Sequence, residues 1–203
     1  LVPYAFDMMS ANKHRWHGTS ATTSGGGDAS YDPSAALLAQ YLGGTGLVNH
    51  CQGLDVADGI QSFERGCGGY GINELIGTQA RGDWSSEDYA AGYQLDLIDC
   101  AAETIMFADS AITVDQSGNF NAGDNAIRGF SSSLTTPGGA YGEYMYPTMD
   151  FRHNSKANTG FCDGHVEAMG LVGKKAGFTE KWNLGYPCEN NDEGRNRYFD
   201  PTK

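Results

Sequence analysis

Apolar residues along this chain occur in short runs separated by glycine-rich and polar stretches, a pattern typical of short strands joined by tight turns. The run "ETIMFADS" at residues 103–110 is apolar in its middle and bounded by acidic residues, which predicts a buried strand. The run "GGYGIN" at residues 68–73 is rich in glycine around one aromatic residue. It predicts a strand or a turn that another backbone approaches closely.

One segment carries the signals of a helix. In "YDPSAALLAQYLGG", Asp32 suits an N-cap, Pro33 suits the first helical position, and a glycine pair ends the pattern. Four apolar residues recur at helical spacing and share one face: Leu37, Leu38, Tyr41 and Leu42. We therefore expect a helix at about residues 33–42.

The strongest hairpin signal lies at Asp163-Gly164. The runs "ANTGFC" and "HVEAM" on either side of this pair have the character of short strands. An Asp-Gly pair between such runs favours a type I′ turn, whose two central residues both need positive φ. Together these elements predict an α+β fold with an antiparallel sheet and short helices.

Length and composition indicate a single globular domain over residues 1–203. The chain is 39% hydrophobic and 19% charged, with 29 glycines, about twice the ordinary share. Many tight turns follow from this glycine content. Residues 1–30 are expected to form an N-terminal extension that includes a flexible loop, because residues 19–30 read "TSATTSGGGDAS".

The net charge of −12 and the absence of any Lys or Arg run argue against nucleic acid and anionic membrane as partners. No apolar run approaches the roughly 18 residues of a membrane helix. The Ser- and Thr-rich loops at residues 19–30 and 131–142 are candidate sites for an O-linked glycan, although exposed loops of this kind are usually bare.

The five cysteines stand at positions 51, 67, 100, 162 and 188, and no pair has C-x-x-C spacing. This usage indicates an oxidising compartment only weakly. We expect a disulfide between Cys51 and Cys67, which would stabilise the domain by about 3 kcal/mol by closing a short loop. Cys162 is expected to pack as a small apolar residue. Cys100 and Cys188 could pair or remain thiols.

The stretch "FRHNSKANTGFCDGHVEAM" at residues 151–169 brings His153, Asp163 and His165 close together in sequence. Imidazole and carboxylate groups can ligate zinc or iron, or act as an acid–base pair. The alternative is a structural hairpin in which His153 forms a hydrogen bond to nearby backbone. We favour the structural interpretation, because the turn itself requires the Asp-Gly pair.

A second candidate site lies in "DQSGNFNAGDN", at residues 115–125. Four side chains there offer oxygen atoms that suit Ca²⁺: Asp115, Asn119, Asn121 and Asp124. The segment departs from the EF-hand pattern, because Phe120 replaces the required glycine and no Glu closes the loop. An Asx-rich turn is the alternative. Known nucleophile, metalloprotease and nucleotide motifs are missing from the sequence, so we do not expect an enzyme.

The spacing of His153, nine residues and then Asp163-Gly164 resembles the C-terminal motif of prepilin-like proteins from planctomycete-type bacteria. Several further blocks are similar to that family and occur in order: "RWHGT" at 15–19, "LLAQYLGG" at 37–44, "FERGCGGYGIN" at 63–73, "ETIMFADS" at 103–110 and "NRYFDP" at 196–201. Such proteins are similar to type IV pilins and type II secretion pseudopilins. The resemblance implies a cleaved leader, a long apolar stem helix and a small α+β head with an antiparallel sheet.

The resemblance implies that Leu1 falls about where the stem helix ends, so we expect that the stem was cleaved from this chain, was left out of it or was not seen. The resemblance implies a non-enzymatic structural subunit of an extracellular or cell-surface filament, or of a secretion pseudopilus, that assembles with copies of itself. The alternative function is a metal-binding module or metal-dependent enzyme that uses His153, Asp163 and His165. The apolar N-terminal segment could be an arm that reaches a neighbouring copy, through Leu1, Val2, Tyr4, Phe6 and Trp16, or it could dock on its own head.

Overall fold

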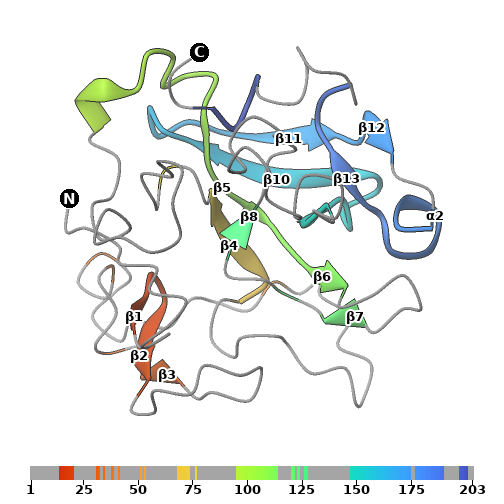
Figure 1. Cartoon of the computed structure of the whole chain (residues 1–203), viewed down its shortest axis with the longest axis horizontal. Helices are drawn as coiled ribbons and strands as arrows, with labels where there is room; N and C mark the ends of the chain where they lie inside the picture. The colour runs from red at the N-terminus through yellow and green to blue at the C-terminus, as the bar shows by residue number, and fades with distance from the viewer. Residues whose placement is uncertain are drawn as a thin grey trace, which may run out of the picture.

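The computed structural model describes residues 14–20, 31–32, 34, 38, 41, 51, 53, 68–73, 76, 95–113, 120–121, 123, 126–127, 147–174, 177–189 and 197–200. Its main element is a five-stranded sheet with strand order β11-β10-β5-β4-β8 (Figure 1). The strands are β4 (Tyr70–Asn73), β5 (Ile105–Asp109), β8 (Ala126–Ile127), β10 (Lys156–Phe161) and β11 (Val166–Gly170).

Neighbouring strands of this sheet are antiparallel, except for β4 and β8, which pair in parallel with Ile72 opposite Ala126. A second sheet has the order β12-β13-β9, with bounds Gly173–Lys174, Leu184–Tyr186 and Met149–Asp150. The α+β prediction with antiparallel sheets is confirmed, although strands dominate. The α-helix α2 (Thr179–Trp182) is a single turn that the sequence did not indicate.

Three short elements complete the described part. A small antiparallel sheet contains β1 (His14–Arg15), β2 (Gly18–Ser20) and β3 (Tyr31–Asp32). A pair joins β6 (Ile112–Thr113) to β7 (Phe120–Asn121), and a 3₁₀ turn, η4, spans Leu95–Leu97. Within the described residues, no helix has the length and apolar character needed to cross a membrane.

The main core is formed by residues from the five-stranded sheet, from β9 and β13, and from the chain near Phe199. Its fully buried members include Ile105, Ile127, Met149, Phe151, Ala157 and Phe199. The buried amide of Asn73 donates to the carbonyl oxygens of Ile105 and Phe199, at 2.8 and 2.9 Å. This amide therefore connects β4, β5 and the C-terminal segment without leaving those donors unsatisfied inside the core.

Trp16 packs on its own head rather than projecting toward a neighbour. Its side chain is only 5% exposed and lies against the partly buried Leu38, Tyr70, Ile72 and Phe107. The Trp16 and Phe107 rings meet edge to face, with centroids 5.2 Å apart. Trp16 thus agrees with the alternative expectation of docking on its own head, because apolar burial holds it there, and the assembly arm itself remains a prediction. Leu1, Val2, Tyr4 and Phe6 lie outside the described residues.

The helix expected at about residues 33–42 also lies mostly outside the described residues. Of that segment the structure describes Ser34, Leu38 and Tyr41, all in turn or 3₁₀ conformation. The backbone N–H and the hydroxyl of Ser34 both donate to Asp32 Oδ1, at 2.9 and 2.7 Å. Asp32 thus accepts hydrogen bonds as an N-cap residue does.

The predicted hairpin at Asp163-Gly164 is confirmed, but its turn type is not. β10 and β11 pair antiparallel from Lys156 opposite Gly170 to Gly160 opposite Val166. Gly164 has φ of +93°, whereas Asp163 is not among the residues with positive φ, and Gly164 N–H donates to Phe161 O. The connection is therefore a type I turn followed by a bulge glycine, not a type I′ turn.

Replacing Gly164 with valine tests this turn. No atom lies within 4 Å of a Cβ built at Gly164, so the cost comes only from a β-branched residue at positive φ. We expect Gly164→Val to lower the free energy of unfolding by more than about 1 kcal/mol in urea titrations. Gly170→Val is the matched control, since that glycine is equally open but lacks positive φ. Equal losses in both variants would contradict this account.

Candidate functional site

The side chain of His153 is positioned by a two-residue turn between β9 and β10. His153 and Lys156 exchange both backbone hydrogen bonds, at 3.0 and 3.2 Å. The residues between them, Asn154 and Ser155, both have positive φ, of 55° and 61°. These are the features of a type I′ hairpin turn, in which asparagine is well tolerated. The type I′ turn predicted at Asp163-Gly164 therefore occurs nine residues earlier, at Asn154-Ser155.

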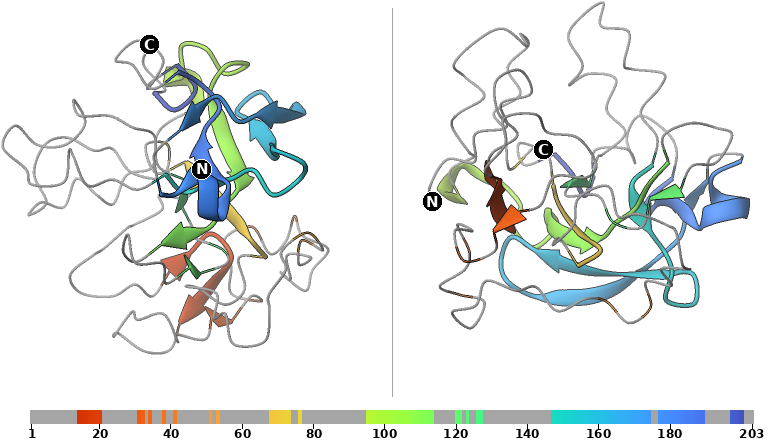
Figure 2. Two further views of the ribbon diagram at one scale, coloured as in Figure 1. Left: turned by 90° about the vertical axis from the view of Figure 1, so that its right-hand side faces the viewer. Right: turned by 90° about the horizontal axis from the view of Figure 1, so that it is seen from below.

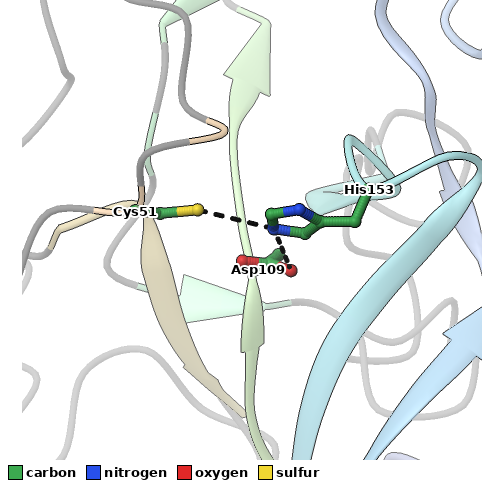
Figure 3. A group of neighbouring side chains, drawn as sticks. All are labelled: Cys51, Asp109 and His153. Atoms are coloured by element: carbon green, nitrogen blue, oxygen red, sulfur yellow. Dashed lines mark hydrogen bonds and ion pairs between the residues drawn. The ribbon is translucent and has the colours of Figure 1, made fainter.

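His153 points toward two buried side chains from distant parts of the chain (Figure 3). Its Nε2 atom lies 3.4 Å from Cys51 Sγ and 3.3 Å from Asp109 Oδ2. Cys51 and Asp109 are buried, while the His153 side chain is 34% exposed. One donor atom from each residue lies within 4.8 Å of the other two. The three side chains therefore form a compact cluster that opens to solvent on the histidine side.

Backbone contacts fix the other two members of this cluster. Asp109 ends β5, and its Oδ2 atom also accepts the N–H of Asn158 on β10, at 2.6 Å. Cys51 is held by its own N–H, which donates to Gly68 O at 3.1 Å. Gly53 lies against the imidazole, since a Cβ there would stand 2.7 Å from His153 Cε1. Only glycine leaves the ring its present place.

Arg152 and Asp150 lie beside the cluster and are themselves buried. Arg152 Nε is 3.1 Å from Asp150 Oδ2, and Arg152 Nη2 is 3.9 Å from Asp109 Oδ1. Arg152 Nη2 also donates to the carbonyl oxygens of Gly69 and Ser110, both at 2.9 Å. Burial raises the pKa of Asp150 to about 6, although the guanidinium of Arg152 acts in the opposite direction.

The expected cluster of His153, Asp163 and His165 does not form. β10 separates His153 from the other two by the length of a six-residue strand, roughly 20 Å. Asp163 and His165 instead form an exposed pair at the far turn, with 2.6 Å between Asp163 Oδ1 and His165 Nδ1. The backbone N–H and the ring of His165 lower the pKa of Asp163. The His165 ring stacks on Phe161, with centroids 4.2 Å apart.

His153 also differs from the expectation that it would bind nearby backbone through its side chain. Its ring contacts side chains 44 and 102 positions away, counted from the Asp109 and Cys51 residue numbers. Sequence reasoning missed both partners. The sequence indicates only that Asp109 bounds an apolar strand and that Cys51 could form a disulfide. Neither residue stands in a motif with His153, so no local pattern joins the three.

Cys51 is a free thiol in the structure, contrary to the expected disulfide with Cys67, which lies outside the described residues. Cys100 and Cys188 are also free thiols, exposed and buried respectively. Burial raises the pKa of Cys188 to about 11, which keeps it protonated and unreactive. Cys162, expected to pack as an apolar residue, is partly exposed at the β10–β11 turn.

Of the expected calcium ligands, Asp115, Asn119 and Asp124 lie outside the described residues. Asn121 belongs to the short strand β7. The calcium site therefore remains a prediction.

The geometry at His153 distinguishes two kinds of chemistry. In a nucleophilic Cys-His-Asp relay the thiol and the carboxylate occupy opposite ring nitrogens, so that a proton passes through the imidazole. Here Cys51 Sγ and Asp109 Oδ2 both approach Nε2. The arrangement is thus convergent rather than linear, and it suits donors that surround one point better than a relay.

Comparisons of the chain with models of protein families, with curated proteins and with solved structures find no match.

The raised pKa of Asp150 predicts a pH-dependent stability. A carboxyl group whose pKa rises from 3.8 to about 6 on folding binds protons more tightly in the folded protein. Its contribution is fully present below the unfolded pKa and is lost as pH rises through about 6. Relative to Asp150→Asn, the natural chain should lose up to about 3 kcal/mol between the two pKa values. Urea unfolding of both proteins from acid to neutral pH measures this. A difference independent of pH would refute it.

Proposed function

We propose that this chain is the repeating, non-enzymatic head of an extracellular pilin-like filament or secretion pseudopilus. The proposal rests first on the sequence resemblance, which centres on His153 and Asp163-Gly164. Those residues lie in the turns before and after β10 (Lys156–Phe161) and so flank the first strand of the outer hairpin of the main sheet. His153 ties the hairpin to β5 through Asp109, and Gly164 turns the chain into β11. These roles of His153 and Gly164 support a structural function of the motif rather than the binding of a substrate.

The observation that carries the proposal is the open edge of β11. Among the described strands β11 pairs only with β10, so its other side presents unpaired backbone groups. The β10–β11 hairpin runs along the outside of the molecule (Figure 2). Val166 on this edge is 72% exposed, and Val172 just beyond it is 51% exposed. An edge strand flanked by exposed valines is suited to strand addition by another chain.

The occupant of this edge that we favour is a second copy of the same chain. A contact between the β11 edge and a different surface of the next copy does not close, and so it generates a filament. The charge of −12 on each copy opposes this packing. Backbone hydrogen bonds and apolar contacts must therefore supply the binding free energy, and divalent cations should strengthen it by screening.

Negative-stain microscopy of native and purified protein tests this function. We expect filaments that lengthen with added magnesium and shorten with added chelator. Val166→Lys should abolish them while leaving the free energy of unfolding unchanged, because a lysine on an edge strand blocks strand addition. Leu97→Lys, which charges a 50% exposed apolar position on η4, is the matched control and should still polymerise.

If microscopy of native material shows only monomers, the filament proposal is wrong. Filaments that survive Val166→Lys would instead show that the contact lies elsewhere than the β11 edge.

A further inference from the structure

The geometry points to a zinc site made by Cys51, Asp109 and His153. The expected metal cluster joined His153 to Asp163 and His165, which lie apart, whereas Cys51, Asp109 and His153 are the potential ligands that the described residues bring together. Thiolate, carboxylate and imidazole are the three ligand types that proteins use for Zn²⁺. The inference is independent of the filament proposal, because a monomeric head would bind the ion equally well.

The spacing of the donor atoms fits one tetrahedral ion. With ordinary bond lengths, a tetrahedral zinc separates its sulfur and nitrogen ligands by about 3.5 Å, and its nitrogen and oxygen ligands by about 3.4 Å. The corresponding separations here are 3.4 Å from Cys51 Sγ to His153 Nε2, and 3.3 Å from His153 Nε2 to Asp109 Oδ2. The second is long for a charge-assisted hydrogen bond, which is usually 2.7–2.9 Å. Both separations therefore match those between ligands of one zinc ion, and the third, between Cys51 and Asp109, is within 4.8 Å.

The surrounding groups hold these donors in place before any ion arrives. Asn158 N–H binds Asp109 Oδ2, and the side chain of Tyr70 lies near Cys51. Gly53 leaves room for the imidazole and limits its movement. Contacts of this kind orient the ligands of known metal centres. The fourth position falls to solvent, which reaches the site beside the partly exposed ring of His153.

Charge also favours a divalent ion at this position. Two buried carboxylates, Asp109 and Asp150, face a single buried guanidinium, Arg152. Asp109 Oδ1 is buried and has no hydrogen-bond partner, and its contact with Arg152 is a long 3.9 Å. An anionic group left incompletely paired in a buried place is costly. A dication between Asp109 and a Cys51 thiolate offsets both negative charges.

The test begins with the full chain, prepared with a phosphine reductant and stripped by a chelator. Titration with zinc chloride in a calorimeter should saturate at one ion per chain and raise the midpoint of thermal unfolding. Cobalt in place of zinc should give a thiolate-to-metal charge-transfer band and the intense visible bands of a four-coordinate ion. This spectrum reports sulfur ligation in the natural chain, so it does not depend on any variant folding.

Single substitutions then assign the ligands. Cys51→Ser, Asp109→Asn and His153→Gln should each weaken zinc binding by more than about tenfold, which is the smallest loss expected when a group that only orients a metal ligand is changed. Cys100→Ser and His165→Gln are the matched controls, since they remove an exposed thiol and an exposed imidazole outside the cluster. Both should bind zinc as the natural chain does.

Gly53→Ala offers a gentler perturbation, because its methyl group displaces the imidazole without removing a ligand. We expect it to shift the cobalt spectrum and to weaken binding. Three results would overturn the inference: no saturable zinc binding, a cobalt spectrum without sulfur ligation, or full affinity in all three ligand variants. If only His165→Gln loses zinc affinity, the zinc site lies instead at the β10–β11 turn, with Asp163 and His165.

Discussion

The buried carboxylate of Asp109 is the group around which the main sheet is organised. It stands at the end of β5 and accepts the N–H of Asn158 on the neighbouring strand β10, at 2.6 Å. The same Oδ2 atom approaches His153, and Oδ1 faces Arg152. A carboxylate without any exposed surface is tolerated only when such partners surround it, because desolvation otherwise drives it to the neutral form. Asp109 therefore contacts both β10, through Asn158, and the turn before β10, through His153. The thiol of Cys51 lies beside the same histidine.

This constraint gives the His–nine residues–Asp-Gly spacing a physical meaning. His153 stands where the turn leads into β10, and Gly164 stands where β10 is left for β11. The spacing thus measures one six-residue strand and its two turns. His153 contacts Asp109 before β10 begins, and Gly164 reverses the chain after β10 ends. A residue added between them would shift every β10 side chain to the opposite face of the sheet. The spacing follows from sheet register, and no chemistry between His153 and Asp163 is needed to explain it.

Local sequence signals predicted the strands at "ETIMFADS" and "GGYGIN" and the hairpin at Asp163-Gly164, because period, glycine and turn residues act over a few positions. They failed where the outcome depends on partners far away in sequence. Asn154-Ser155 contains no glycine, so its sequence does not indicate a type I′ turn, although it forms one. The cluster of Cys51, Asp109 and His153 spans 102 positions and arises only from strand order. Sequence alone allows Trp16 to belong to an assembly arm, because an isolated aromatic residue does not reveal which apolar surface covers it.

The position of the cluster also determines what the proposed zinc ion would do for the fold. Zinc bound by residues that are apart in the unfolded chain contributes its binding free energy to folding. The pairing of β5 with β10 brings Asp109 near His153, whereas Cys51 comes from a separate segment of the chain. An ion among them would link those segments much as a disulfide does, and Cys51 is the residue for which a disulfide was expected. A glycine-rich chain gains most from such a link, because glycine loses more backbone freedom on folding than other residues do. A zinc ion held by Cys51, Asp109 and His153, as proposed, would therefore stabilise the sheet.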